Sequence, residues 1–433
     1  MIGLVTAVVA LLYSFPWLRP PEIGGVAFPV QRLLAWLGLS FLVARLLVKG
    51  PLIAGPAARG FLWRVAVYFG FLLLITLRLF AYGEGFFPQY FLMDLAKYAA
   101  AFSIVYLCYY ALQAGLVSER RFVANIILSG GVATLVVYLL LGLYYAGFRS
   151  QTEILAPSFG GALGVWPTAG ILPRLAGPTA EPQQLSVALL TPLLLMLSRE
   201  HIRRAWPVAV LTGVALLLSQ SKFSIISLAL AGIYLTAVYR RWRKPMIMVG
   251  LLAVPLAGLA LLRLPTFSST LESGLAAGAF VERLQNLLLL VAIIREHPGF
   301  GIGPGQYGAY YGHTFFGDWS FSPGYTPNMD FLKVFAETGI VGFALLMLLL
   351  GYLARLVFRW YRSVEPEARS RYLAFSLGSA GLLLNMLIGY ELLHAFFWIN
   401  VGMLLYYVDG SGRRAVRMPD SRANWSVAPA GES

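Results

Sequence analysis

The sequence predicts an all-α integral membrane protein of about twelve transmembrane helices, with a large outer loop between the ninth and tenth. Of its 433 residues, 59% are hydrophobic and only 12% are charged, whereas a soluble protein carries roughly a quarter charged residues. The apolar residues also occur in blocks of about 20, which is the length at which a helix crosses a bilayer. Composition and spacing therefore predict the same fold class.

Twelve apolar blocks mark the predicted spans. They cover residues 1–18, 28–48, 61–82, 90–113, 122–147, 182–198, 205–220, 222–239, 245–263, 330–358, 368–389 and 391–408. The first block lacks the basic start and the small-residue cleavage site of a signal peptide, so we expect it to remain as a helix. An even number of spans places both termini on the same side of the membrane.

The arginines and lysines predict which side that is, because cytoplasmic loops are enriched in these residues. With the N-terminus in the cytoplasm, every inner loop is basic, whereas the short outer loop from Tyr82 to Gln89 contains no arginine or lysine. The basic tail after residue 408 also suits a cytoplasmic membrane surface. The net charge of +14 thus follows membrane topology, and no nucleic-acid partner is expected.

The predicted organisation has four parts. Residues 1–263 hold helices 1–9 and an outer loop at 148–180, residues 264–329 form the large outer loop, residues 330–408 hold helices 10–12, and residues 409–433 form the tail. Within the large loop, the apolar run from Leu287 to Ile294 is too short to span and has charged residues on both sides. This pattern is typical of an interfacial or re-entrant helix.

Several outer cations break the positive-inside pattern. They are Arg78, Lys222, Arg263 and Arg283. Arg174 and Glu181 lie just before the sixth span, at the level of the lipid headgroups. An anionic ligand at the outer leaflet would explain all of these cations together, and interfacial snorkelling is the alternative for a lone arginine.

Other polar residues have structural interpretations. Two pairs of opposite charges are each one helical turn apart, namely Asp94 with Lys97 and Lys333 with Glu337. We expect the two charges of each pair to neutralise each other. The glycine-rich segment 297–307 lacks the lysine of a phosphate loop and is predicted to be a tight turn that allows close backbone approach. Histidine, aspartate and glutamate form no cluster at ligand spacing, so no metal site is expected.

Four stretches resemble, in order, the O-antigen polymerase and O-antigen ligase superfamily of bacterial envelope glycosyltransferases. Arg174–Gln184 resembles its Arg-x-x-Gly…Glu-Pro element, and Ser219–Lys222 resembles its Ser-x-Ser-Arg turn with lysine in place of arginine. Arg283–Tyr307 is similar to the Arg…His-Pro-x-x-Gly-x-Gly-x-Gly stretch. Asn328–Gly342 is similar to the Asn…Phe-Leu…Glu-x-Gly-x-x-Gly element. The likeness covers roughly residues 170–345 by motif.

The resemblance implies a multi-pass enzyme of the bacterial inner membrane, with cytoplasmic termini and a periplasmic active face. It implies metal-independent, inverting transfer of a glycan from undecaprenyl diphosphate, without a cofactor. The expected activity is polymerisation of lipid-linked repeats of O-antigen or exopolysaccharide, and ligation to lipid A core is the alternative. The implied partners are the lipid-linked oligosaccharide, a glycan or lipid A core acceptor, the bilayer and a chain-length regulator.

The resemblance and the outer cations suggest the site residues. Arg78, Arg174, Lys222, Arg283 and Asn328 are the predicted diphosphate-binding residues, because cations stabilise the charge that develops on a departing diphosphate. The general base stays open, since this chain has proline at position 327, where the family usually has histidine. His313 and Glu181 are the two candidates.

Two other classes of protein compete with the enzyme. A transporter or flippase predicts inverted repeats and buried charges at the membrane midplane, whereas here the charges gather on one face and no repeat is visible. A structural subunit of an envelope complex is the third hypothesis. The long, aromatic-rich outer loops argue against it.

Overall fold

The structure is a computed structural model, and almost all of the chain that it describes is helical. It describes residues 1–15, 30–49, 54–79, 87–147, 165–166, 173–179, 181–239, 244, 278–320, 325–327, 329–361, 364–387, 389 and 392–417. The predicted ninth span at 245–263, Arg263 and Asn328 lie outside these residues. The predicted all-α fold class is confirmed for the part of the chain described.

The helices follow the predicted spans closely. They are α1 (Ile2–Leu11), α2 (Val30–Lys49), α3 (Pro56–Leu79), α4 (Pro88–Gln113), α5 (Glu119–Tyr145), α7 (Pro182–Met196), α8 (Ile202–Leu218), α9 (Lys222–Val238), α12 (Gly278–Glu296), α13 (Tyr307–Phe316), α14 (Asp330–Trp360), α15 (Pro366–Asn385) and α16 (Ala395–Arg417). Two differences stand out. Helix α1 is shorter than its predicted span, and α16 continues beyond the predicted end at residue 408.

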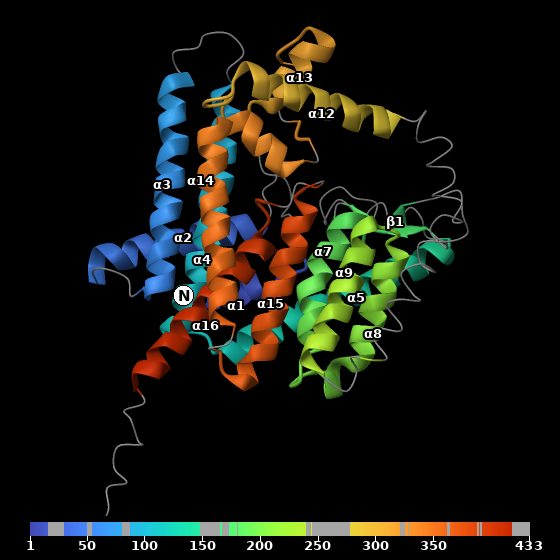
Figure 1. The fold of residues 1–433 in the computed structure, drawn as a ribbon. Coiled ribbons are helices and arrows are strands. Elements are labelled where there is room, and N and C mark those ends of the chain that lie inside the picture. Colours follow the sequence, from blue (N-terminus) through green and yellow to red (C-terminus); the bar gives the residue numbers. More distant parts are fainter. Residues whose placement is uncertain are drawn as a thin grey trace, which may run out of the picture.

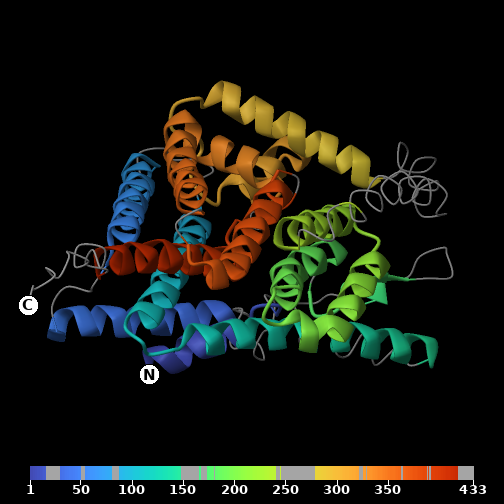
Figure 2. The same cartoon turned by 60° about the horizontal axis from the view of Figure 1, so that its bottom comes forward.

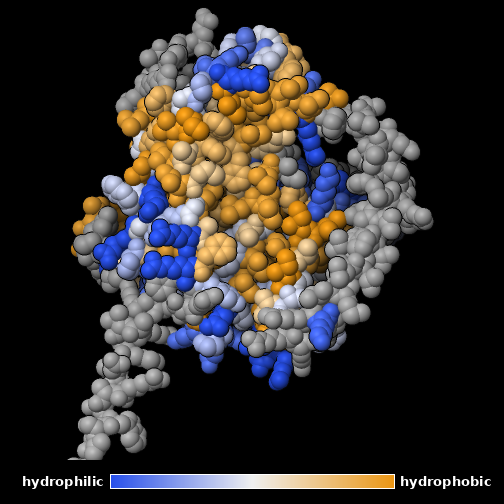
Figure 3. All heavy atoms as spheres, in the orientation of Figure 1, coloured by the Kyte–Doolittle hydropathy of each residue, from blue (hydrophilic) through white to orange (hydrophobic). Residues whose placement is uncertain are grey.

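Four of the described helices, α3, α4, α5 and α14, are long and apolar enough to cross a membrane. Helices α1, α7 and α9 are apolar but shorter. Large apolar side chains such as Leu74, Leu139 and Leu348 are exposed, and Figure 3 shows a broad hydrophobic area between more hydrophilic ends. An apolar area of this size on the outside is expected where lipid replaces water. The chain is a multi-pass membrane protein.

The helices form two groups that lie side by side in both views (Figures 1 and 2). Helices α7, α8 and α9 pack on one another and on α5, while α3, α4, α14 and α16 make up the other group. Helix α15 joins the groups, because it contacts α7 and α9 on one side and α16 on the other. This arrangement brings the starts of α7, α9 and α14 to the same end of the bundle.

Helix α14 is broken at Gly339, whose backbone is not helical (φ 64°, ψ −172°). The glycine-rich segment 297–307 fits against this break. The backbone N–H of Ile340 donates to the carbonyl of Pro298 at 2.8 Å, and that of Gly303 donates to the carbonyl of Glu337 at 2.7 Å. A Cβ atom at Gly339 would lie 2.3 Å from the carbonyl carbon of Gly299. The predicted close backbone approach is confirmed, and it requires glycine.

Helices α12 and α13 form a small cap over this end of the bundle. They share a hydrophobic cluster with α14, to which Leu290, Ile293, Tyr307 and Ala336 contribute. Helix α12 lies across the ends of the other helices (Figure 1). The run from Leu287 to Ile294 is therefore part of a helix that lies across the bundle, and its interfacial or re-entrant placement in the membrane stays a prediction.

Candidate functional site

A short two-stranded sheet positions Arg174. Strand β1 (Val165–Trp166) pairs antiparallel with β2 (Arg174–Leu175), and Trp166 is opposite Arg174. Strand β2 contacts α7 and α8. The turn after it is buried, and at Gly177 (φ 55°) a Cβ atom would lie 2.5 Å from a methyl carbon of Val137. This close packing places Arg174 at the end of the bundle where α7 begins.

Glu181 occupies the N-cap of α7, and Pro182 follows at the first helical position. Proline suits that position because it has no N–H to leave unsatisfied. A carboxylate at a helix N-terminus is stabilised by the helix dipole. The chain geometry thus places Glu181 at the start of α7, six residues after the strand that carries Arg174.

Two of the predicted site residues, Glu181 and Arg283, act electrostatically on a third, Arg174. Burial lowers the pKa of Arg174, the charge of Glu181 raises it, and the charge of Arg283 lowers it. Arg283 comes from α12, which crosses above the α7–α9 group (Figure 1). These residues are far apart in the sequence, and the fold brings them together.

The guanidinium of Arg174 is incompletely satisfied. Its Nε atom is buried and has no hydrogen-bond partner in the described part of the chain. Burying an N–H without a hydrogen-bond partner costs about 1–3 kcal/mol. An acceptor that binds there relieves this cost, which makes binding more favourable. The position therefore suits an anionic oxygen.

The turn before α9 is tied to the start of α7 by serine hydroxyls. Ser186 lies 2.8 Å from Ser224 and 3.2 Å from Ser219, measured between their Oγ atoms. Ser221 caps α9 by accepting from the backbone N–H of Phe223. Lys222, the first residue of α9, is exposed, so its ammonium is open to solvent at the same end of the bundle as Glu181.

The remaining predicted residues are less completely described. Arg78 lies in the last turn of α3, and nothing further is described of its side chain. His313 is exposed near the end of α13, where its ring stacks on Trp319 with centroids 4.0 Å apart. In both views α13 lies toward the C-terminal end of α12, whereas the α7–α9 group lies toward its N-terminal end. His313 and Glu181 thus lie in different parts of this end of the bundle.

A tyrosine–asparagine chain that the sequence analysis missed supports the helix of Arg283. Tyr307 donates to the side-chain carbonyl of Asn286 at 2.7 Å, and the Asn286 amide donates to the Tyr325 hydroxyl at 2.7 Å. Tyr325 in turn donates to Glu282 at 2.6 Å. Burial raises the pKa of Tyr325, so its hydroxyl remains a donor. The one sequence feature that pointed to this network was the high density of tyrosine in the predicted large loop.

A buried charge network connects the spans to the cap. Lys97 lies 2.5 Å from Asp94, and Lys333 lies 3.4 Å from Glu337, so both predicted pairs are confirmed. The sequence analysis missed the bond between them, in which Lys333 donates to Asp94 at 3.0 Å. The backbone N–H of Tyr307 donates to Glu337 at 3.3 Å. The network therefore joins α4, α14 and α13.

Metal-ligating residues do not cluster in the described part of the chain, where no three of His, Cys, Asp and Glu lie close enough to hold an ion. The single cysteine, Cys108, is buried in α4. The cationic side chains described at the end of the bundle where α7 begins are those of arginine and lysine. Any charge stabilisation that these described residues provide comes from guanidinium and ammonium groups.

Together the fold and the site define a class, namely helical membrane proteins with a cationic site at one end of the bundle. Residues 207–347 match the family model described as O-antigen ligase, and this region contains three of the four motifs. The chain thus carries a region of the O-antigen ligase and polymerase superfamily, and the predicted recognition is confirmed. No curated protein matches the chain.

Proposed function

We propose that the chain transfers a glycan from undecaprenyl diphosphate at the periplasmic face of the bacterial inner membrane. The observation that carries the proposal is the buried, unpartnered Nε atom of Arg174 beside Glu181 and Arg283. The match to the O-antigen ligase family supports lipid-linked glycan transfer in O-antigen biosynthesis in general.

The proposed reaction is a single displacement that inverts the anomeric carbon. The acceptor hydroxyl oxygen attacks this carbon, and the bond from the carbon to the diphosphate oxygen breaks. The electron pair leaves with undecaprenyl diphosphate, while the hydroxyl proton passes to a base. Arg174 and Arg283 stabilise the negative charge of the leaving group, and guanidinium groups do this by paired hydrogen bonds without a metal. Lys222, Arg78 and Asn328 complete the proposed diphosphate site.

Glu181 is the better supported base. Its charge acts on Arg174, which we place at the leaving group, and its backbone occupies the N-cap of α7. His313 is the alternative, with its ring stacked on Trp319. In an inverting displacement the base must reach the acceptor hydroxyl on the side of the anomeric carbon opposite the diphosphate that the arginines hold. The base therefore lies close to the arginines but across the anomeric carbon from them, and of the two candidates Glu181 is the one whose charge acts on Arg174.

Glu181→Gln tests this assignment, because the amide keeps the size of the carboxylate but does not accept a proton. We expect the turnover rate to fall by about 10²–10⁴-fold, the usual contribution of a general base, and His313→Ala to retain most of its activity. Initial rates on a lipid-linked oligosaccharide measure both, with Glu296→Gln on the exposed end of α12 as the control. A larger loss of activity in His313→Ala than in Glu181→Gln would instead identify His313 as the general base.

Mass spectrometry of the products tests the reaction itself and separates polymerase from ligase. We expect donor alone to yield chains longer by whole repeat units, together with free undecaprenyl diphosphate. Product that forms only when lipid A core is added would instead establish a ligase, the alternative activity. Donor that crosses a liposome membrane without any new glycosidic bond would instead show a flippase and would overturn the proposal.

A further inference from the structure

A pocket of about 350 Å³ lies at the opposite end of the bundle from the candidate site. Arg199 follows α7, Val238 ends α9, Tyr361 follows α14, and Arg369 and Ser370 belong to the first turns of α15. In the predicted orientation this end faces the cytoplasm. The volume falls within the range of small-molecule sites, about 300–1,000 Å³.

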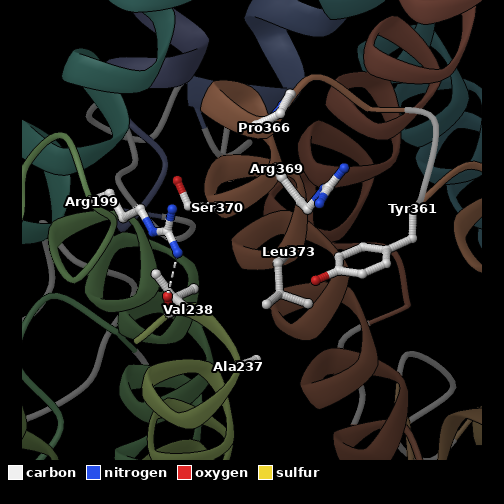
Figure 4. A pocket seen from close by; sticks show the side chains of 8 residues that line it. All are labelled: Arg199, Ala237, Val238, Tyr361, Pro366, Arg369, Ser370 and Leu373. Carbon is white, nitrogen blue, oxygen red and sulfur yellow. Dashed lines mark hydrogen bonds between the residues drawn. The ribbon is translucent and has the colours of Figure 1, made fainter. Parts of the chain in front are cut away.

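The lining of this pocket is basic. Figure 4 shows Arg199 and Arg369 on opposite sides, with the hydroxyl of Tyr361 directed inward. The guanidinium of Arg199 is held in place because Nη2 donates to the carbonyl of Val238 at 2.7 Å. Acidic residues do not occur among the described lining residues. Arg369 Nη2 donates to the carbonyl of Val364 at 3.2 Å, and its guanidinium carbon lies 5.8 Å from the centroid of the Tyr361 ring. Two arginines from separate segments of the chain therefore line one space.

A buried hydroxyl provides an independent observation. Ser370 is only 5% exposed, it lines the pocket, and its Oγ atom has no hydrogen-bond partner in the described structure. A buried hydroxyl is normally satisfied. Ser370 also lies in the second turn of α15, whose N-terminus, at Pro366, borders the pocket. The positive end of a helix dipole attracts anions.

We propose that this pocket binds the phosphate group of an anionic ligand, with Arg199 and Arg369 as cationic partners and Ser370 as a hydroxyl donor. Basic pockets between helices on the cytoplasmic side commonly bind anionic lipid headgroups, so a phosphodiester headgroup is one source of this chemistry. A soluble phosphate is the other. The site lies away from the proposed catalytic residues, and the proposal does not depend on them.

The test uses the purified full-length chain, stripped of lipid in a neutral detergent. Binding is measured by native mass spectrometry with dihexanoyl phosphatidylglycerol, with dihexanoyl phosphatidylcholine and with inorganic phosphate. We expect phosphatidylglycerol to bind more tightly than phosphatidylcholine. Arg199→Gln and Arg369→Gln should each weaken phosphatidylglycerol binding by about tenfold, which is the effect of losing one charge-assisted hydrogen bond. Arg203→Gln, which changes an exposed arginine in the first turn of α8 that does not line the pocket, should leave binding unchanged.

Ser370→Ala adds a measurement that does not depend on charge. Because the substitution removes a buried hydroxyl without a partner, the midpoint of thermal unfolding should rise in the absence of ligand. The further rise caused by phosphatidylglycerol should become smaller. If inorganic phosphate binds as tightly as phosphatidylglycerol and both arginine variants weaken its binding equally, the site is supported and its ligand is a soluble phosphate. Equal binding of the two lipids, or equal effects of Arg203→Gln and Arg199→Gln, would overturn the proposal.

Discussion

Arg174→Ala is expected to abolish glycan extension while the protein still reaches the membrane at a normal level. Arg174 belongs to β2, the charge of Glu181 acts on its guanidinium, and its buried Nε atom has no hydrogen-bond partner in the described part of the chain. Loss of one preorganised donor at a developing negative charge lowers the turnover rate by about 10²–10³-fold. Arg283→Ala should have a similar effect. A complementation assay, read on a gel of glycan chains beside an immunoblot, measures both variants.

Two controls sharpen this prediction. Arg174→Lys retains the charge but loses the paired geometry of guanidinium, so partial activity is expected. Arg295→Ala removes an exposed arginine from the far end of α12 and should leave chain length unchanged. Normal glycan chains from the Arg174→Ala variant would refute the assignment, and chains shortened equally by Arg295→Ala would point to a general effect of charge.

Lys333→Met is expected to cause the largest loss of stability. The substitution leaves Asp94 and Glu337 without their shared cation, although both carboxylates are buried. Removal of one partner from a buried ion pair costs about 3–5 kcal/mol. The free energy of unfolding in detergent, or the midpoint of thermal unfolding with the yield of folded protein, measures the loss.

Two further variants distinguish this explanation from a packing defect. Lys97 is more exposed, and Asp94 keeps Lys333 when Lys97 is removed, so Lys97→Met should cost much less. Asp94→Asn with Glu337→Gln, added to Lys333→Met, should recover much of the lost stability, because the two buried carboxylates that lose Lys333 are then uncharged amides. If the triple variant were as unstable as Lys333→Met alone, the cause would be packing rather than charge.

Local patterns account for what could be predicted about this fold. Apolar runs predicted the helices, and the i,i+3 and i,i+4 spacings predicted the pairs of Asp94 with Lys97 and of Lys333 with Glu337. The glycines of segment 297–307 predicted a close backbone approach. Each of these properties depends on residues within a few turns of one another, so a single sequence reveals them.

Such local patterns did not predict the contacts between segments that are distant in the sequence. The bond from Lys333 to Asp94 joins two helices, and the chain from Tyr307 to Glu282 joins three segments of the cap. In the same way, spacing did not predict the meeting of Ser186 with Ser219 and Ser224. Long-range pairing depends on how the helices pack, and residue order alone does not specify that.

The sequence by itself determined the class of protein, a helical membrane protein. It also determined the superfamily, because motif order is a property of the chain. The tertiary structure decided which cations share a site. It set Arg174 beside Glu181 and brought α12 across the bundle so that the charge of Arg283 reaches them. The physical reason is that hydrophobicity acts along each segment, whereas an electrostatic site depends on distances between segments that only packing creates.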